Sequence, residues 1–192
     1  FANAALANVA VNVPKGAYVI NQNIVGNFWT NDGVETKGDG CIYIKDNRKQ
    51  QMLSKVIEKM YNGQSVNITC FGDSTTEGVG SSQHTKFRLE SGQESTWTCS
   101  SAYPAQLQKL LQDIFNNSNI KVNNAGYAGK TLYNGWAANN IKSKVTDAFA
   151  TEILIIGFGL NDVANSDFTA DKYLIELKKI VGYAISRNIV PI

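Results

Sequence analysis

The chain has 192 residues, a length that fits one α/β domain with a little to spare. Eighteen Lys and Arg stand against sixteen Asp and Glu, and these charges are scattered, which argues against a nucleic-acid groove and a polybasic membrane patch. No apolar run approaches the ~20 residues of a membrane span, so small-molecule or glycan chemistry fits better than nucleic-acid or membrane binding.

The amino-terminal segment differs in composition from the rest of the chain. It is rich in Asn and Gly, and short β-like runs at residues 17–20 and 41–44 are separated by turn signals such as Asn31-Asp32-Gly33. We therefore expect residues 1–47 to be a β-rich segment or the end of a preceding domain, and residues 48–192 to form the main domain.

Apolar residues recur with the helical period in four places after Arg48. The first helix is expected to end near Gly63, the second to begin near Pro104, and the fourth to begin with Thr169 as its cap. The residues expected to be buried are Met52, Leu53, Val56, Ile57, Met60 and Tyr61 in the first helix, Leu107, Leu110, Leu111, Ile114 and Phe115 in the second, Ile141, Val145, Ala148 and Phe149 in the third, and Leu174, Leu177, Val181, Ala184 and Ile185 in the fourth.

Runs rich in β-branched and apolar residues alternate with these helices. They predict strands near residues 66–71, 120–124 and 152–158 and from residue 189 onward. Such alternation calls for a parallel sheet with helices on both faces. The expected fold class is α/β, a flavodoxin-like three-layer α/β/α sandwich.

Three of the predicted strands run into small polar loops. Ser74 follows the first, the loop from Gly126 to Gly129 follows the second, and Asn161 follows the third. The carboxyl ends of parallel strands meet at one edge of the sheet, where open α/β sheets build their sites. A hydroxyl, unhindered backbone N–H groups and a side-chain amide are the parts that an acyl-transfer site needs, because a developing oxyanion must meet donors already in place.

These loops resemble the sequence blocks of the SGNH, or GDSL-like, hydrolases. Gly72-Asp73-Ser74 is similar to the first block, residues 124–131 to the second, and Gly159-Leu160-Asn161-Asp162 to the third. The resemblance covers the chain from about Val66 onward. It implies that Ser74 is the nucleophile and that the Gly129 N–H and the Asn161 amide form the oxyanion hole.

Each of these residues also has a purely structural interpretation. Ser74 could be an ordinary turn serine that bonds its own backbone, and the glycines could be turn glycines. Asp73, Thr75 and Gly126 are predicted to lie at the substrate, although Asp73 and Asp162 fit better as residues that hold their loops through backbone N–H groups.

The general base is the missing part of the resemblance. The family takes it from a late Asp-x-x-His block, and no such sequence occurs in residues 1–192. We therefore expect a chain truncated at its carboxyl terminus, whose site is completed by a missing part of the same protein or by a second chain. The only histidine, His84, is a weaker candidate for the base than for a solvated or substrate-facing loop residue.

Two further expectations concern the long polar loop and metal binding. Residues 79–101 form a long polar loop that follows Ser74 closely in the sequence. Loops of this length are usually functional, so we expect this one to form a wall of the site. One histidine and no Cys-x-x-Cys pair make a metal site unlikely by the usual spacings, and no cofactor is expected. Cys70 is predicted to be a small buried residue, whereas pairing of Cys41 and Cys99 is left open.

The resulting hypothesis is a serine ester hydrolase that removes acyl groups, most plausibly acetyl, from a carbohydrate or another small ester. An acyltransferase of the same fold and a non-catalytic glycan-binding domain are the alternatives. The resemblance and the β-rich amino-terminal segment favour an extracellular protein or a virion component such as a viral tail fibre. A homo-oligomer is left open.

Overall fold

The computed structural model describes residues 11–12, 34–37, 41–44, 48–85 and 99–192, and the chain divides into two compact units, residues 1–54 and 55–192. In the first unit, strands β1 (Val11–Asn12), β2 (Val34–Lys37) and β3 (Cys41–Ile44) form an antiparallel sheet in the order β1-β3-β2. The strand predicted at residues 41–44 is thus present as β3. The one predicted at residues 17–20 lies outside the described residues, and the domain boundary before Arg48 stays a prediction.

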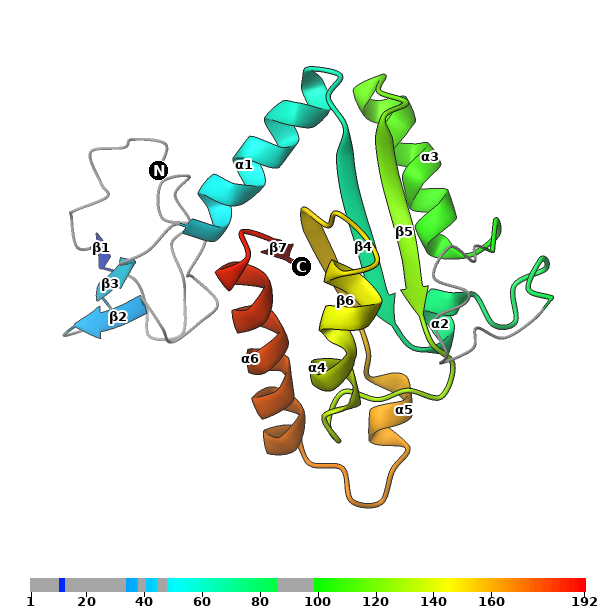
Figure 1. Cartoon of the computed structure of the whole chain (residues 1–192). Helices are drawn as coiled ribbons and strands as arrows, with labels where there is room; N and C mark the ends of the chain where they lie inside the picture. Colours follow the sequence, from blue (N-terminus) through cyan, green and yellow to red (C-terminus); the bar gives the residue numbers. More distant parts are fainter. Residues whose placement is uncertain (1–10, 13–33, 38–40, 45–47, 86–98) are drawn as a thin grey trace. The chain divides into compact units, whose positions relative to one another are not determined.

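The second unit is built on a parallel sheet (Figure 1). Its strands are β4 (Val66–Gly72), β5 (Ile120–Gly126), β6 (Ile153–Gly157) and β7 (Val190–Pro191), in the order β5-β4-β6-β7. All neighbouring pairs in this sheet are parallel, as the alternation of strands and helices predicts. Strand β4, which leads to Ser74, therefore lies between β5 and β6.

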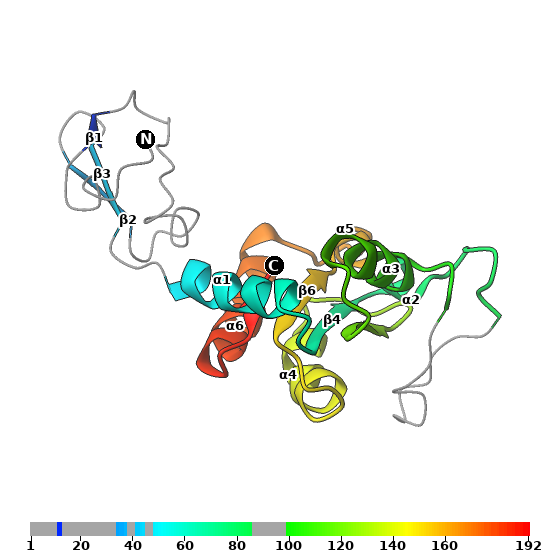
Figure 2. The ribbon, with the colours of Figure 1, turned by 90° about the horizontal axis from the view of Figure 1, so that it is seen from above.

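Helices cover both faces of this sheet, and Figure 2 shows α4 and α6 on one face and α3 on the other. The helices are α1 (Arg48–Tyr61), α2 (Ser74–Glu77), α3 (Tyr103–Phe115), α4 (Trp136–Ile141), a π-helix over Lys142–Thr146, α5 (Leu160–Val163) and α6 (Ala170–Ser186). The predicted three-layer α/β/α sandwich is confirmed. None of the described helices has both the length and the apolar character that a membrane span requires.

The predicted helix ends are also found. Gly63, two residues after the end of α1, takes a positive φ of 69°, and Pro104 occupies the first turn of α3. Thr169 caps α6, because its Oγ1 accepts a hydrogen bond from the Lys172 N–H at 3.2 Å. Local sequence therefore determines where these three helices begin or end.

The core lies mainly between the sheet and the helices α4 and α6. Phe71 of β4 and Leu154 of β6 are completely buried there, and burying one such side chain stabilises the fold by roughly 1.5–3 kcal/mol. The remaining buried members of this cluster are Ala125, Tyr127, Leu132, Ala137, Ile141, Val145, Ile180, Ala184 and Ile189.

Four apolar residues predicted to be buried are exposed instead: Tyr61, Leu110, Ile114 and Leu174. In α3 the physical reason is visible. Gln108 Oε1 accepts from the Val122 N–H, and Gln112 Nε2 donates to the Ile120 carbonyl oxygen, so two glutamines face the backbone of edge strand β5. This orientation turns Leu110 and Ile114 toward solvent.

Candidate active site

The carboxyl ends of three parallel strands meet at one edge of the sheet. Gly72, the last residue of β4, is paired in register with Gly126 of β5 and Gly157 of β6. The pairing continues into the loops, because the Asp73 N–H donates to the Gly157 carbonyl at 3.2 Å and the Tyr127 N–H donates to the Gly72 carbonyl at 2.9 Å. The three loops singled out in the sequence therefore leave the sheet side by side, as predicted.

Gly72, Gly126 and Gly157 form a glycine row beneath the short helix α2. A Cβ atom at Gly72 or Gly157 would strike the Thr76 side chain, and a Cβ at Gly126 would lie 2.5 Å from the Thr76 carbonyl carbon and 2.6 Å from the Glu77 Cα. Only glycine lets the helix backbone approach the sheet this closely. The glycine row thus sets the position of α2, and with it the position of Ser74.

Ser74 is the first residue of α2, and its side chain is half-buried. Asp73 caps this helix: its Oδ1 accepts from the Thr75 N–H at 2.9 Å and from the Thr75 hydroxyl at 2.6 Å. Asp73 therefore holds its loop through a backbone N–H, as the sequence suggests, and it is almost fully buried. Thr75 is exposed, so it stays the more accessible of the residues predicted to contact a substrate.

The two residues expected to form the oxyanion hole come from neighbouring loops that are tied together. Asn161 of α5 donates from Nδ2 to the Lys130 carbonyl oxygen at 3.0 Å, directly beside Gly129. Gly129 is exposed, has a positive φ of 75°, and has no atom within 4 Å of where a Cβ would lie. Because an amide nitrogen carries two N–H groups, Asn161 keeps one for a ligand after the bond to Lys130.

Asp162 fixes the same pair of loops from within the protein. It is completely buried, and its Oδ1 accepts from the N–H groups of Leu132 and Tyr133, both at 2.7 Å. This arrangement confirms the prediction that Asp162 holds its loop. Burial raises the pKa of the neighbouring Tyr173 hydroxyl, and the negative charges of Asp162 and Asp73 raise it further.

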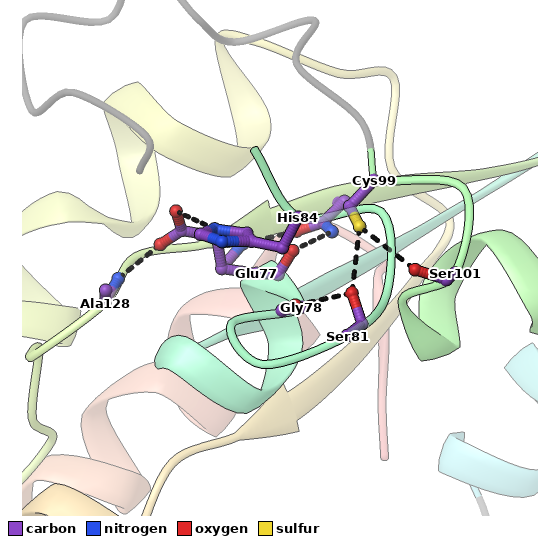
Figure 3. A network of polar contacts seen from close by, with 9 residues as sticks. Glu77, Gly78, Ser81, His84, Cys99, Ser101 and Ala128 are labelled. Atoms are coloured by element: carbon purple, nitrogen blue, oxygen red, sulfur yellow. Dashed lines mark hydrogen bonds and ion pairs between the residues drawn. The ribbon is translucent and has the colours of Figure 1, made fainter. Parts of the chain in front are cut away.

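Glu77 and His84 form a contact that the sequence analysis missed. Glu77 is the last residue of α2 and is completely buried, and its Oε1 lies 3.4 Å from His84 Nε2 (Figure 3). The His84 side chain is only 8% exposed, so of the two expectations for this residue the solvated one is wrong, and the substrate-facing one stays a prediction. The sequence does contain a pattern that could have predicted this contact: a glutamate three residues after Ser74, followed seven residues later by the only histidine.

The long loop after α2 is described only at its two ends. Its beginning and end are held together, because Ser81 Oγ lies 3.1 Å from Cys99 Sγ and the Gln83 N–H donates to Ser101 Oγ at 3.2 Å. Residues 86–98 lie outside the described residues, so the predicted wall of the site stays a prediction. Cys70 is a free, completely buried thiol as expected, and Cys99 is also free and buried.

Among the described residues, no three His, Cys, Asp or Glu side chains cluster in a way that could hold a metal ion. The groups at this edge include the Ser74 hydroxyl, the exposed backbone of Gly129 and the Asn161 amide. Such an arrangement suits attack on a carbonyl carbon and stabilisation of the resulting oxyanion.

Comparisons with known proteins agree with this geometry. The model of the GDSL-like lipase/acylhydrolase family matches residues 70–192, which include all three loops. Among solved structures, a two-domain esterase active on acetylated mannans superposes with a TM-score of 0.53 at 21% identity, over 73% of this chain and 32% of that protein. This likeness supports the assigned fold.

Two further esterases are similar at lower TM-scores. The SGNH-hydrolase family esterase AlinE4 is 26% identical over 67% of this chain and 57% of its own, with a TM-score of 0.49. The psychrotrophic esterase EstA from Pseudoalteromonas sp. is 21% identical over 65% and 56%, with a TM-score of 0.45. The chain thus spans about a third to just over half of the length of these proteins.

A search of curated proteins found no match. The family model nevertheless covers well over half of the chain, including Ser74 and the loops that carry Gly129 and Asn161. The chain belongs to the GDSL-like lipase/acylhydrolase family.

Proposed function

We propose that this protein is a serine ester hydrolase in which Ser74 is the nucleophile and the Gly129 N–H and Asn161 Nδ2 form the oxyanion hole. The observation that carries the proposal is the bond from Asn161 Nδ2 to the Lys130 carbonyl oxygen, which holds the two donor loops together at the edge where Ser74 emerges. Family membership supports the reaction class, a carboxylic ester hydrolase.

The proposed reaction has two steps. Ser74 Oγ attacks the ester carbonyl carbon, its proton passes to a general base, and the alcohol leaves with a proton to give an acyl-enzyme. Water then attacks the acyl carbon and releases the acid and free Ser74. In both steps the carbonyl oxygen becomes negatively charged, and donors already held in place by the Lys130 and Asp162 contacts stabilise it without reorganisation.

The proposed substrate is an acetyl ester, with an acetylated carbohydrate as the preferred class. Ser74 is half-exposed, and Thr75 and Gly129 are exposed. A site with this much exposure can admit an ester whose alcohol part is bulky. Because one structural neighbour is described as active on acetylated mannans, an acetylated mannan is the first polysaccharide to test.

The test uses the full-length protein and its Ser74→Ala variant. The unmodified protein should hydrolyse p-nitrophenyl acetate and release acetate from acetylated mannan, whereas the variant should lose both activities and keep its melting temperature. The melting temperature should hold because a half-exposed hydroxyl at a helix start contributes little to packing. Retention of more than a few per cent of the activity would exclude Ser74 as the nucleophile.

The same assay separates the alternatives. Transfer of the acetyl group to an added sugar in preference to water would identify an acyltransferase. Binding of the mannan without any acyl release would identify a glycan-binding domain.

A further inference from the structure

Glu77 is a buried carboxylate that the proposed reaction does not use. It lies three residues after Ser74, at the end of α2, and its side chain is completely buried. Burying a carboxylate is costly unless hydrogen bonds compensate for the lost water, so its partners are informative. Figure 3 shows two of them, the backbone N–H of Ala128 and the ring of His84.

The first contact reaches the loop that carries Gly129. Glu77 Oε2 accepts from the Ala128 N–H at 2.6 Å, a short distance of the kind expected when the acceptor is charged. Ala128 is the residue directly before Gly129. The opposite side of this loop is held by the bond from Asn161 Nδ2 to Lys130. The Ala128–Gly129 peptide is therefore flanked by an N–H that is bonded to α2 and a carbonyl that is bonded to α5.

The backbone of Glu77 is hydrogen-bonded to β5, the strand that leads into the Gly129 loop. Asn124 Nδ2 donates to the Glu77 carbonyl oxygen at 3.2 Å, and Asn124 Oδ1 accepts from the Gly126 N–H at 2.9 Å. Gly126 lies directly beneath the Glu77 backbone. Glu77 thus connects the helix that carries Ser74 with the end of β5, where the Gly129 loop begins.

The second contact comes from the long loop. His84 Nε2 lies 3.4 Å from Glu77 Oε1, and the His84 backbone N–H donates to the Ser81 carbonyl at 3.1 Å. Ser81 is in turn held against Cys99, so His84 is presented by the anchored part of the loop. A ring held in this way fixes the orientation of the Glu77 carboxylate.

We propose that Glu77 is a positioning residue that holds the Ala128–Gly129 peptide in its oxyanion-binding orientation, and that His84 orients Glu77 and is not the base of Ser74. The inference rests on the proposed function of Ser74, Gly129 and Asn161.

The test compares Glu77→Met with Glu77→Gln in the full-length protein, with p-nitrophenyl acetate as the substrate. Met keeps a similar volume but accepts no hydrogen bond, so the Gly129 peptide should shift and kcat should fall by about 10-fold to 100-fold with little change in KM. Gln can still accept from the Ala128 N–H, and its amide can face His84, so it should recover kcat to within about 5-fold of the unmodified protein.

A matched control lies at the other end of the same sheet. Glu152 pairs with Lys59 and accepts from the Asn67 N–H at 3.2 Å, next to the amino ends of the strands. Glu152→Met should lower the melting temperature and leave kcat unchanged. Glu77→Met could lower kcat only because it destabilises the whole protein. If Glu152→Met, at an equal loss of melting temperature, lowered kcat as much as Glu77→Met does, the positioning role would be wrong.

The role of His84 is tested with the variant His84→Gln, whose side-chain amide can still donate a hydrogen bond to Glu77. We expect kcat within about 10-fold of the unmodified protein, whereas removal of a general base typically costs 10²-fold to 10⁴-fold. A loss of about 10³-fold or more would make His84 the base and overturn its assignment as the partner of Glu77.

Amide hydrogen exchange gives a readout that does not depend on activity. In Glu77→Met the Ala128 amide should exchange at least about 10-fold faster, because a hydrogen bond to a charged group is lost, while the Tyr127 amide bonded to Gly72 should keep its rate. An unchanged Ala128 rate would overturn the inference, even if the proposed esterase activity were confirmed. A protein with no esterase activity but with faster Ala128 exchange would refute the proposed function and leave the Glu77 contact supported.

Discussion

Replacing Gly126 with alanine tests whether the glycine row positions Ser74. The new Cβ would lie 2.5 Å from the Thr76 carbonyl carbon and 2.6 Å from the Glu77 Cα, and both are backbone atoms that no rotamer change can move away. Carbon atoms pack at about 3.5–4.0 Å, so α2 must move by about 1 Å. Since Ser74, the proposed nucleophile, is part of α2, its side chain must move with the helix.

The expected effects follow from that displacement. A shift of about 1 Å at a reacting group can lower the rate by about 100-fold, so kcat for p-nitrophenyl acetate should fall by roughly that factor. Overpacking a buried site also destabilises a protein by about 1–3 kcal/mol, which a thermal or urea melt of the same sample would report.

Gly182→Ala is the matched control. Gly182 lies within α6, is exposed, and has nothing within 4 Å of where its Cβ would lie. Alanine favours a helix over glycine by about 1 kcal/mol, so this variant should be more stable and equally active. If Gly126→Ala also kept the kcat and stability of the unmodified protein, α2 would not be held against the glycine row, and the row would not set the position of Ser74.

Two further predictions concern the oxyanion loop and the sheet. Asn161→Ala should lower kcat by ~10²–10³-fold with a small change in KM, because its amide meets a charge present only in the transition state; a raised KM with an unchanged kcat would make Asn161 a ground-state contact. Burial raises the pKa of the Cys70 thiol from 9.0 to about 11. The folded state therefore holds this proton more tightly than the unfolded state. This difference contributes up to about 3 kcal/mol to the free energy of unfolding. The contribution is fully present below pH 9 and should be lost as the pH rises from 9 to 11. Urea melts across that range should show a shallower decline for Cys70→Ala, and parallel curves for both proteins would contradict the assignment.

The sheet and the position of the site could be predicted from local sequence. Apolar strands of the right length were followed by small polar loops, and the rule that parallel strands end at one edge placed Ser74 near Asn161 without knowledge of strand order. The cap at Thr169 and the stop at Gly63 depend on residues adjacent in sequence, so they too were accessible.

The features that were missed depend on contacts between distant segments. Nothing local to Gly157 or Gly126 shows that α2 packs on them, since that contact exists only once three strands are aligned. The bond from Ala128 to Glu77 spans 51 residues. The exposure of Leu110 likewise follows from which side of α3 faces β5, and a periodic apolar pattern alone does not fix that side when glutamines compete for it.

Covalent labelling would show directly whether Ser74 is the nucleophile. The full-length protein would be incubated with an alkyl phosphonate ester that carries a p-nitrophenolate leaving group. The serine oxygen bonds to phosphorus, p-nitrophenolate departs, and the phosphoryl oxygen of the stable product takes the place of the oxyanion. The peptides of the treated protein would then be examined by mass spectrometry. We expect a single adduct on the peptide that contains Ser74, no adduct in Ser74→Ala, and slower labelling in Asn161→Ala. The assignment of Ser74 as the nucleophile would be wrong if the unmodified protein hydrolysed esters but carried the adduct on another residue, or carried none on Ser74.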